Sequence, residues 1–162
     1  TQNPNDQLGT YALPESQLDR FLMCITLGYP DRAAERELLA GADRRDAVAR
    51  LMPVMSPAEL QAVQQAVVAV HAAPPLLDYL QDLIAATRSG RWFVEGLSPR
   101  AGLAVLRAAR ARALLAQRDY VAPDDIQAIL PQTIAHRLQP VPGSGRGRTE
   151  QVRALIEAVP LP

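Results

Sequence analysis

The sequence contains no lysine, and all 17 of its basic residues are arginine. A phosphate-binding P-loop of the form G-x-x-x-x-G-K-[ST] requires a lysine, so this chain cannot contain one. The acidic residues also number 17, which leaves no net positive charge to hold a nucleic-acid backbone without specificity. We therefore expect no nucleic-acid partner.

The sequence also has one cysteine, two histidines and no long apolar run. The single Cys24 cannot form an intrachain disulfide, and its place in an apolar run predicts a small buried side chain. The only histidines, His71 and His136, are far apart in the chain, so their spacing gives no indication of a metal site. No run approaches the roughly 18 apolar residues of a membrane span, and no signal segment opens the sequence, so we expect a cytoplasmic protein without a membrane span.

What the sequence does contain is mostly helical pattern, with capping residues and prolines at the helix starts and glycine or proline at the ends. A short helix is expected from Pro14 to about Arg20, followed by a boundary near Pro30. Beyond it the periodicity predicts helices over 32–40, 45–51, 57–71, 75–88, 97–118, 123–130 and 149–158, with Pro131 opening a further turn to 138. The expected fold class is mainly α, a helical body with a short preface.

The one strand signal is the continuous apolar run Phe21–Leu27, which is typical of a strand buried on both faces of a parallel sheet. One strand cannot form a sheet. Either its neighbours lie outside this chain, or the run packs in another way. Because a bare apolar strand edge invites pairing, we expect the chain to associate through residues 1–30.

The helix expected over 97–118 begins with an unusual first turn. Ser98 can cap the free N–H groups and Pro99 suits the first helical position. Arg100 then faces the positive end of the helix dipole, at a cost of roughly 0.3–1 kcal/mol unless an anion lies nearby. That anion is Glu95 or a ligand; alternatively, Arg100 simply curls out to solvent.

Two further polar residues stand out in the preface. Asn3 lies in an expected loop, and Arg20 lies at the C-terminal end of the short helix, where a cation is electrostatically favourable. Together with Arg100, they suggest the peripheral part of a phosphate site whose centre lies elsewhere.

The motifs themselves resemble a known family. T-Q-N-P, then G-T-Y-x-L-P-E-x-Q-L-D-R-F-L-M and G-Y-P, is similar to the second half of the nucleotide-binding core of MoxR-type AAA+ ATPases. S-P-R-A, then an alanine-leucine helix and R-D-Y-V-x-P-D-D-I, resembles their helical lid, and the resemblance extends to the closing V-P-L-P. It implies that residues 1–30 are the end of the α/β core, with one helix and one strand, and that residues 31–162 are an AAA+ lid bundle.

The resemblance also implies a role for each of the three residues. Asn3 corresponds to the sensor 1 residue that orients the attacking water, Arg20 in L-D-R-F to the arginine finger that reaches a neighbouring subunit's nucleotide, and Arg100 in S-P-R-A to the sensor 2 arginine of the lid. The full-length protein is then expected to bind ATP and Mg²⁺ and to form a ring, a hexamer. It would act as a chaperone that remodels or matures client proteins, with a von Willebrand A-domain protein as a plausible partner.

The chain departs from the family pattern in what it lacks. The P-loop, the acidic residues that hold Mg²⁺ and the strand before T-Q-N-P are absent, so the chain alone is expected neither to bind ATP tightly nor to hydrolyse it. Trp92 and Phe93 stand where a polar connection is expected, and the sequence leaves open whether they are extra lid core or an exposed contact.

Three other interpretations compete with this one. The first is a non-enzymatic helical interaction module that binds a protein partner, and the second is the lid of a chelatase-type AAA+ ATPase, which the T-Q-N-P and L-D-R-F motifs disfavour. The third, a helix-turn-helix DNA-binding protein, is disfavoured because Arg107, Arg110 and Arg112 do not share one helix face and the net charge is zero.

Overall fold

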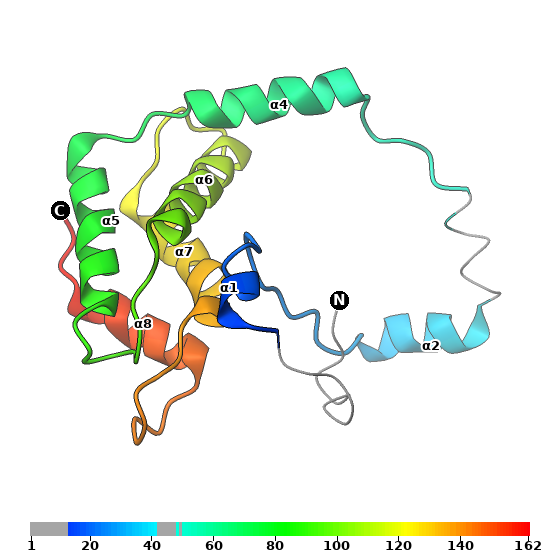
Figure 1. Ribbon diagram of the computed structural model, residues 1–162. Helices are drawn as coiled ribbons and strands as arrows, with labels where there is room; N and C mark the ends of the chain where they lie inside the picture. Colours follow the sequence, from blue (N-terminus) through cyan, green and yellow to red (C-terminus); the bar gives the residue numbers. More distant parts are fainter. Residues whose placement is uncertain (1–12, 42–47, 49) are drawn as a thin grey trace. The chain divides into compact units, whose positions relative to one another are not determined.

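The chain is mainly helical, as its sequence predicts (Figure 1). The computed structural model describes residues 13–41, 48 and 50–162. These residues divide into two compact units, one formed by residues 13–24 with 67–162 and the other by residues 25–66. None of the helices in the described ranges combines the length and apolar character that a membrane crossing requires.

The larger unit contains most of the helices. Their bounds are α1 Glu15–Leu18, α5 Pro74–Thr87, α6 Pro99–Leu115, α7 Pro123–Ile134, the 3₁₀ turn η1 Ala135–Arg137, and α8 Arg148–Ala158. Three of them, α5, α6 and α7, begin with a proline, whose fixed φ suits the first helical position and whose missing N–H would have no partner there. The sequence places the start of each of these helices to within about two residues.

The core of this unit lies between α7 and its neighbours α5, α6 and α8. Along α6, small residues at helical spacing are fully buried, among them Ala101, Val105, Ala109 and Ala113. Because most of these side chains are short, α7 packs closely on α6. The larger buried side chains of α5, α7 and α8 fill most of the core, chiefly Leu83, Ile126, Leu130, Ile134 and Leu155. The composition of α6 predicts that it is the inner element, but that place belongs to α7, which contacts α5, α6, α8 and η1. Helix α6 contacts only α5 and α7 among the described helices and leaves Leu103 and Leu115 exposed.

Helix α7 differs from the prediction at Pro131. The sequence favours a break there, but α7 continues through Pro131 to Ile134. A proline inside a helix removes one backbone hydrogen bond and crowds the preceding turn. Here Leu130 and Ile134 on either side of it are buried in the core, and this packing outweighs the local preference.

The smaller unit is described by α2 Arg32–Ala40 and the larger part of α4 Pro57–Ala69. Asp31 caps α2 by accepting a hydrogen bond from the Ala34 N–H (2.8 Å). Ser56 and Glu59 form the predicted capping box at α4, with reciprocal bonds of 3.2 and 2.6 Å. Neither helix has a buried residue. Most of the helix predicted over 45–51 lies outside the described residues.

The strand expected over Phe21–Leu27 is not formed. The segment has no regular secondary structure: within the described residues no strand pairs with it, and Ile25 and Leu27 are 69% and 90% exposed. A strand needs a neighbouring strand to satisfy its backbone, whereas the Cys24 N–H donates to the carbonyl of Gln132 in helix α7 (2.8 Å). Cys24 is consequently exposed and not the buried side chain that its apolar surroundings suggest.

Candidate functional site

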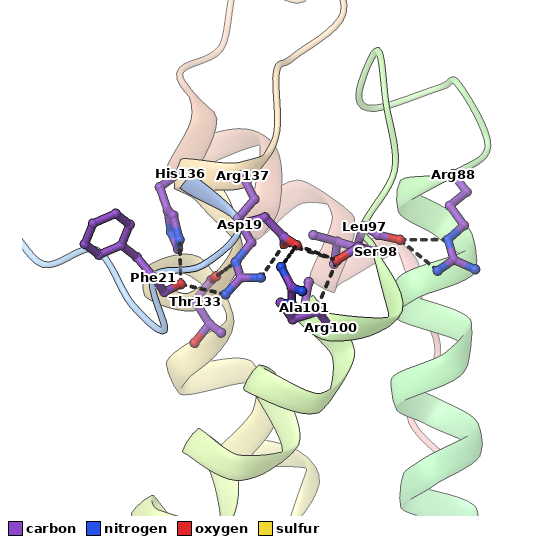
Figure 2. Close-up of polar contacts among 10 residues, drawn as sticks. All are labelled: Asp19, Phe21, Arg88, Leu97, Ser98, Arg100, Ala101, Thr133, His136 and Arg137. Atoms are coloured by element: carbon purple, nitrogen blue, oxygen red, sulfur yellow. Dashed lines mark hydrogen bonds and ion pairs between the residues drawn. The ribbon is translucent and has the colours of Figure 1, made fainter. Parts of the chain in front are cut away.

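Four polar side chains meet where the end of α1 faces the start of α6 and the 3₁₀ turn η1 (Figure 2). Asp19 is their centre. It accepts hydrogen bonds from Arg137 Nη1 (2.6 Å), from Ser98 Oγ (3.1 Å) and from Arg100 Nη1 (3.5 Å). We call Asp19, Ser98, Arg100 and Arg137 the Asp19 cluster.

Arg137 is the buried member of the Asp19 cluster, with a side chain only 4% exposed. Each part of its guanidinium has a partner: Nη1 donates to Asp19, Nη2 to the carbonyl of Phe21 (2.6 Å) and Nε to the carbonyl of Thr133 (3.1 Å). A planar, fixed fork of donors suits such a set of oxygens, and lysine could not reproduce it. Arg137 therefore ties α7 and η1 to the segment after α1.

Ser98 has two roles at the start of α6. Its Oγ accepts the N–H of Ala101 (3.2 Å), which is the predicted N-cap, and donates to Asp19. The Asp19 carboxylate thus lies beside the N-terminus of α6, where the helix dipole favours a negative charge.

The Asp19 carboxylate is also the anion that lies beside Arg100. The local cost of a cation in the first turn of α6 is offset by an anion, and among the described residues that anion is Asp19 rather than Glu95. The contact is long, 3.5 Å, and the Arg100 side chain is 63% exposed. An exposed ion pair of this kind contributes about 0.2–1 kcal/mol, so Arg100 is held weakly.

Arg20 lies immediately beside the Asp19 cluster. It follows α1, its backbone N–H donates to the carbonyl of Gln17 (3.1 Å), and its side chain is exposed. The structure therefore brings two of the predicted site residues, Arg20 and Arg100, to one region around Asp19. The third, Asn3, lies outside the described residues.

His136 completes the surroundings of this region. Its Nε2 lies 3.2 Å from the Phe21 carbonyl, so that oxygen is contacted from two sides. Burial lowers the pKa of His136, the hydrogen bond to Phe21 opposes that shift, and the nearby charge of Arg137 adds to it. The imidazole is accordingly less easily protonated here than in water.

Sequence reasoning missed Asp19 and Arg137. Asp19 stands in the same L-D-R-F motif as Arg20, and an acidic residue within a motif that otherwise supplies a cation is a usable signal. Arg137 carries no local signal for this role, because the partners that it binds after α1, Asp19 and the Phe21 carbonyl, are 118 and 116 residues away in sequence.

A second ionic group lies between α6 and α7 and serves the fold. Asp125 is 1% exposed and accepts two bonds of 2.7 Å from Arg118 and one of 2.9 Å from the Ala122 N–H at the start of α7. Burial opposes the charge of Asp125, but these hydrogen bonds hold its pKa below the ordinary aspartate value. Asp125 is therefore a helix cap of α7 and the buried member of an ion pair with Arg118.

The residues Trp92 and Phe93 belong to the core of the larger unit. Phe93 is fully buried and Trp92 packs partly buried against the same cluster. Their backbone is held by the loop after η1 and by α8, since the Val141 N–H (3.3 Å) and Gln151 Nε2 (3.1 Å) both donate to the Trp92 carbonyl. Of the two alternatives, extra core is the correct one.

The chemical capacity of the region follows from its groups. Arg100 is an exposed, permanently charged fork with a weak partner, which is suited to a phosphate oxygen. No group of three or more carboxylate, histidine or cysteine ligands is placed for a metal ion in the part of the chain that the structure describes. The region thus offers the exposed arginines Arg100 and Arg20 to an anionic ligand.

Most of the larger unit matches a known domain family. The AAA lid domain model matches residues 85–158, which include α6, α7, η1 and α8. Of the Asp19 cluster, Ser98, Arg100 and Arg137 fall inside the matched lid, and Asp19 lies outside it.

Individual proteins extend the similarity beyond the lid. The uncharacterized protein YeaC of Bacillus subtilis (strain 168) is 38% identical over 165 residues, which cover 100% of this chain and 52% of YeaC. Chaperone MoxR1 of Mycobacterium tuberculosis is 36% identical over 147 residues, 85% of this chain and 38% of MoxR1. A crystal structure of a candidate ATPase from Cytophaga hutchinsonii superimposes with a TM-score of 0.83 at 28% identity, over 99% of this chain and 52% of that one. The chain spans about half the length of these relatives, or less.

Proposed function

Because the chain belongs to the MoxR family of AAA+ ATPases and corresponds to the C-terminal portion of its members, we propose that it supplies the lid and two arginines to an ATP site completed by the rest of a longer protein. Residues 1–30 are assigned to the end of the nucleotide-binding core and residues 31–162 to the lid. The observation that carries the proposal is the placement of Arg100, exposed at the start of a lid helix and held only by a weak contact to Asp19.

In this proposal Arg100 is the sensor 2 residue. An arginine that exchanges its contact with Asp19 for the γ-phosphate of ATP would close the lid over the nucleotide and release it after hydrolysis. The weak Asp19 contact favours such an exchange, since little is lost when the pair separates.

Arg20 is the proposed arginine finger, which acts on the nucleotide of the next subunit in a ring. Its exposure leaves the guanidinium accessible to a neighbour. An arginine finger stabilises the charge of the transferring phosphoryl group and contributes on the order of 10³–10⁵ in rate in other phosphoryl-transfer enzymes. Asn3 keeps its predicted role as sensor 1, orienting the attacking water.

ATP and Mg²⁺ belong to the full-length protein. The chain has no lysine for a phosphate-binding loop, so by itself it is proposed to be inactive as an ATP hydrolase. The full-length protein would couple hydrolysis, in a ring that we propose to be a hexamer, to the remodelling of client proteins in the cytoplasm. The name of MoxR1 as a chaperone supports clients of this kind, and a von Willebrand A-domain protein remains a proposed partner.

The test is ATP hydrolysis by the full-length protein carrying Arg20→Ala. We expect turnover to fall by roughly 10³-fold. Mixing these subunits with subunits whose P-loop lysine is replaced should restore hydrolysis, because the second kind still presents Arg20 to its neighbours. Arg36→Ala, in the exposed helix α2, is the matched control. Normal turnover by Arg20→Ala alone would overturn the assignment.

A further inference from the structure

The residues on both sides of Arg20 are bound by one lid residue. Arg137 donates to the Asp19 carboxylate (2.6 Å) and to the Phe21 carbonyl (2.6 Å), so it holds the residue before Arg20 and the residue after it (Figure 2). Arg20 itself, between these two anchors, has an exposed side chain. A short segment fixed at both ends leaves its middle residue few backbone conformations.

The anchoring residue is well supported. The Arg137 side chain is 4% exposed, and its third nitrogen, Nε, donates to the Thr133 carbonyl within α7 (3.1 Å). The lid therefore presents a rigid fork to the segment 19–21. His136 adds a second contact to the Phe21 carbonyl from the same turn, at 3.2 Å.

The two arginines of the lid use the Asp19 carboxylate differently. Arg137 is buried and close to it, whereas Arg100 is exposed and 3.5 Å away. Arg100 can leave Asp19 while Arg137 stays, because the carboxylate keeps its short bond to Arg137 and its bond to Ser98.

We propose that Arg137 is a positioning residue for Arg20: through Asp19 and the Phe21 carbonyl, the lid of one subunit sets the finger that serves its neighbour. The proposal rests on the function proposed for Arg20. It adds that the finger is placed by the lid of its own chain and not by the segment 19–21 alone. A lid displaced from its position would carry the finger with it.

The consequence is a kinetic signature that differs from simple loss of structure. A misplaced finger lowers the rate of the chemical step in the next subunit, while the subunit that carries the defect still binds ATP and still responds to a neighbour's correct finger. A displacement of about 1 Å in a catalytic group can cost on the order of 10²-fold in rate.

The test uses the full-length protein with Arg137→Lys, which keeps the charge and loses the fork. We expect kcat for ATP hydrolysis to fall roughly 10- to 100-fold with little change in KM. Subunits with a replaced P-loop lysine, added in excess, should restore turnover at the Arg137→Lys sites. Arg153→Lys, an exposed arginine of α8, is the matched control and should keep the normal kcat.

A second variant guards against a folding defect. Asp19→Asn has the same shape and can still accept a bond from Arg137, but it loses the charge that makes this bond strong. If Arg137→Lys unfolds at a lower temperature than the control, Asp19→Asn takes its place, with the same expected loss in kcat and the same recovery on mixing.

The outcomes separate the two proposals. Normal turnover by Arg20→Ala overturns the finger assignment itself. In a second outcome, Arg20→Ala loses turnover and mixing restores it, while folded Arg137→Lys and Asp19→Asn keep a normal kcat. This outcome supports Arg20 as the arginine finger and overturns the positioning role of Arg137. A loss in these variants that mixing does not restore also overturns the positioning role, because it places the defect in the variant's own site.

Discussion

At the scale of single residues, the Asp19 carboxylate forms ion pairs with two arginines, and the two ion pairs differ in distance and burial. The contact with Arg137 is structural, since the Arg137 side chain is 4% exposed and removing Asp19 would leave this buried guanidinium without its counter-charge. The exposed contact with Arg100 contributes little to stability and leaves this arginine available. Distance and burial together, and not the count of ion pairs, distinguish the two roles.

A prediction at this scale concerns His136. Its pKa is lowered in the folded chain, so below about pH 6.5 the unfolded chain binds more protons than the folded one. The free energy of unfolding therefore falls as pH decreases through this window. His136→Gln keeps a side-chain donor for the Phe21 carbonyl and does not titrate, so its stability should change less between about pH 7.5 and pH 5.

Urea denaturation of both chains at the two pH values measures this difference. His71→Gln, at an exposed histidine, is the control and should follow the parent chain. Identical pH dependence of the His136→Gln variant and the parent would show that the folded structure does not penalise the imidazolium.

At the scale of elements, the connection between α5 and α6 decides where Arg100 is presented. Arg88 donates two bonds to the Leu97 carbonyl (3.0 and 2.7 Å), and the Leu97 N–H donates to Thr87 Oγ1 (3.1 Å). The residue before Leu97 is Gly96, whose Cα lies against Arg88 with no space for a side chain. The start of α6 is thus fixed from the end of α5 as well as from Asp19.

Replacing this glycine should loosen the connection. In Gly96→Ala the added Cβ would lie 2.7 Å from the Arg88 Cα, which belongs to the backbone and cannot move aside. We expect a loss of about 1–3 kcal/mol in the free energy of unfolding, measured by chemical denaturation.

Gly102→Ala, within α6, is the matched comparison. Its Cβ would meet only the tip of the Ile84 side chain, at 2.8 Å, and alanine favours the helix by about 1 kcal/mol. The two effects should nearly cancel. Equal losses for Gly96→Ala and Gly102→Ala would contradict the argument from backbone contact.

At the scale of the whole molecule, the buried residues among those that the structure describes all belong to one of the two units. The buried core residues all lie between Val70 and Leu155. Residues 25–66, where the structure describes them, contain none, and their apolar side chains such as Leu39 and Val54 are 85% and 95% exposed. The free energy of folding that comes from apolar burial therefore resides in the larger unit.

Limited proteolysis should show this difference directly. Trypsin cuts after arginine, and cleavage within a packed helix requires local unfolding first. We expect cleavage after Arg32, Arg36 and Arg50 well before cleavage after Arg107, Arg110 and Arg112 of α6, as read by mass spectrometry over time. Comparable rates at the two sets would show that the larger unit is not selectively stable.

Local features of the sequence were enough to predict most of the helices and the family. Helix starts at Asp31, Ser56 and Ser98 were identified because capping depends on residues three apart, which lie within one turn in any fold. Arg100 was singled out for the same reason, as a cation misplaced within its own first turn. The family motifs are likewise contiguous, so they could be read without knowledge of the packing.

The tertiary structure alone decided which groups meet. The anion that faces Arg100 is Asp19, 81 residues away and not the nearby Glu95, and Arg137 reaches Asp19 across 118 residues. The tertiary structure also decided that Phe21–Leu27 forms no strand within the described part of the chain and that α7 runs through Pro131. Contacts between distant segments depend on how helices pack, and packing is set by the whole set of buried side chains, which no local pattern contains.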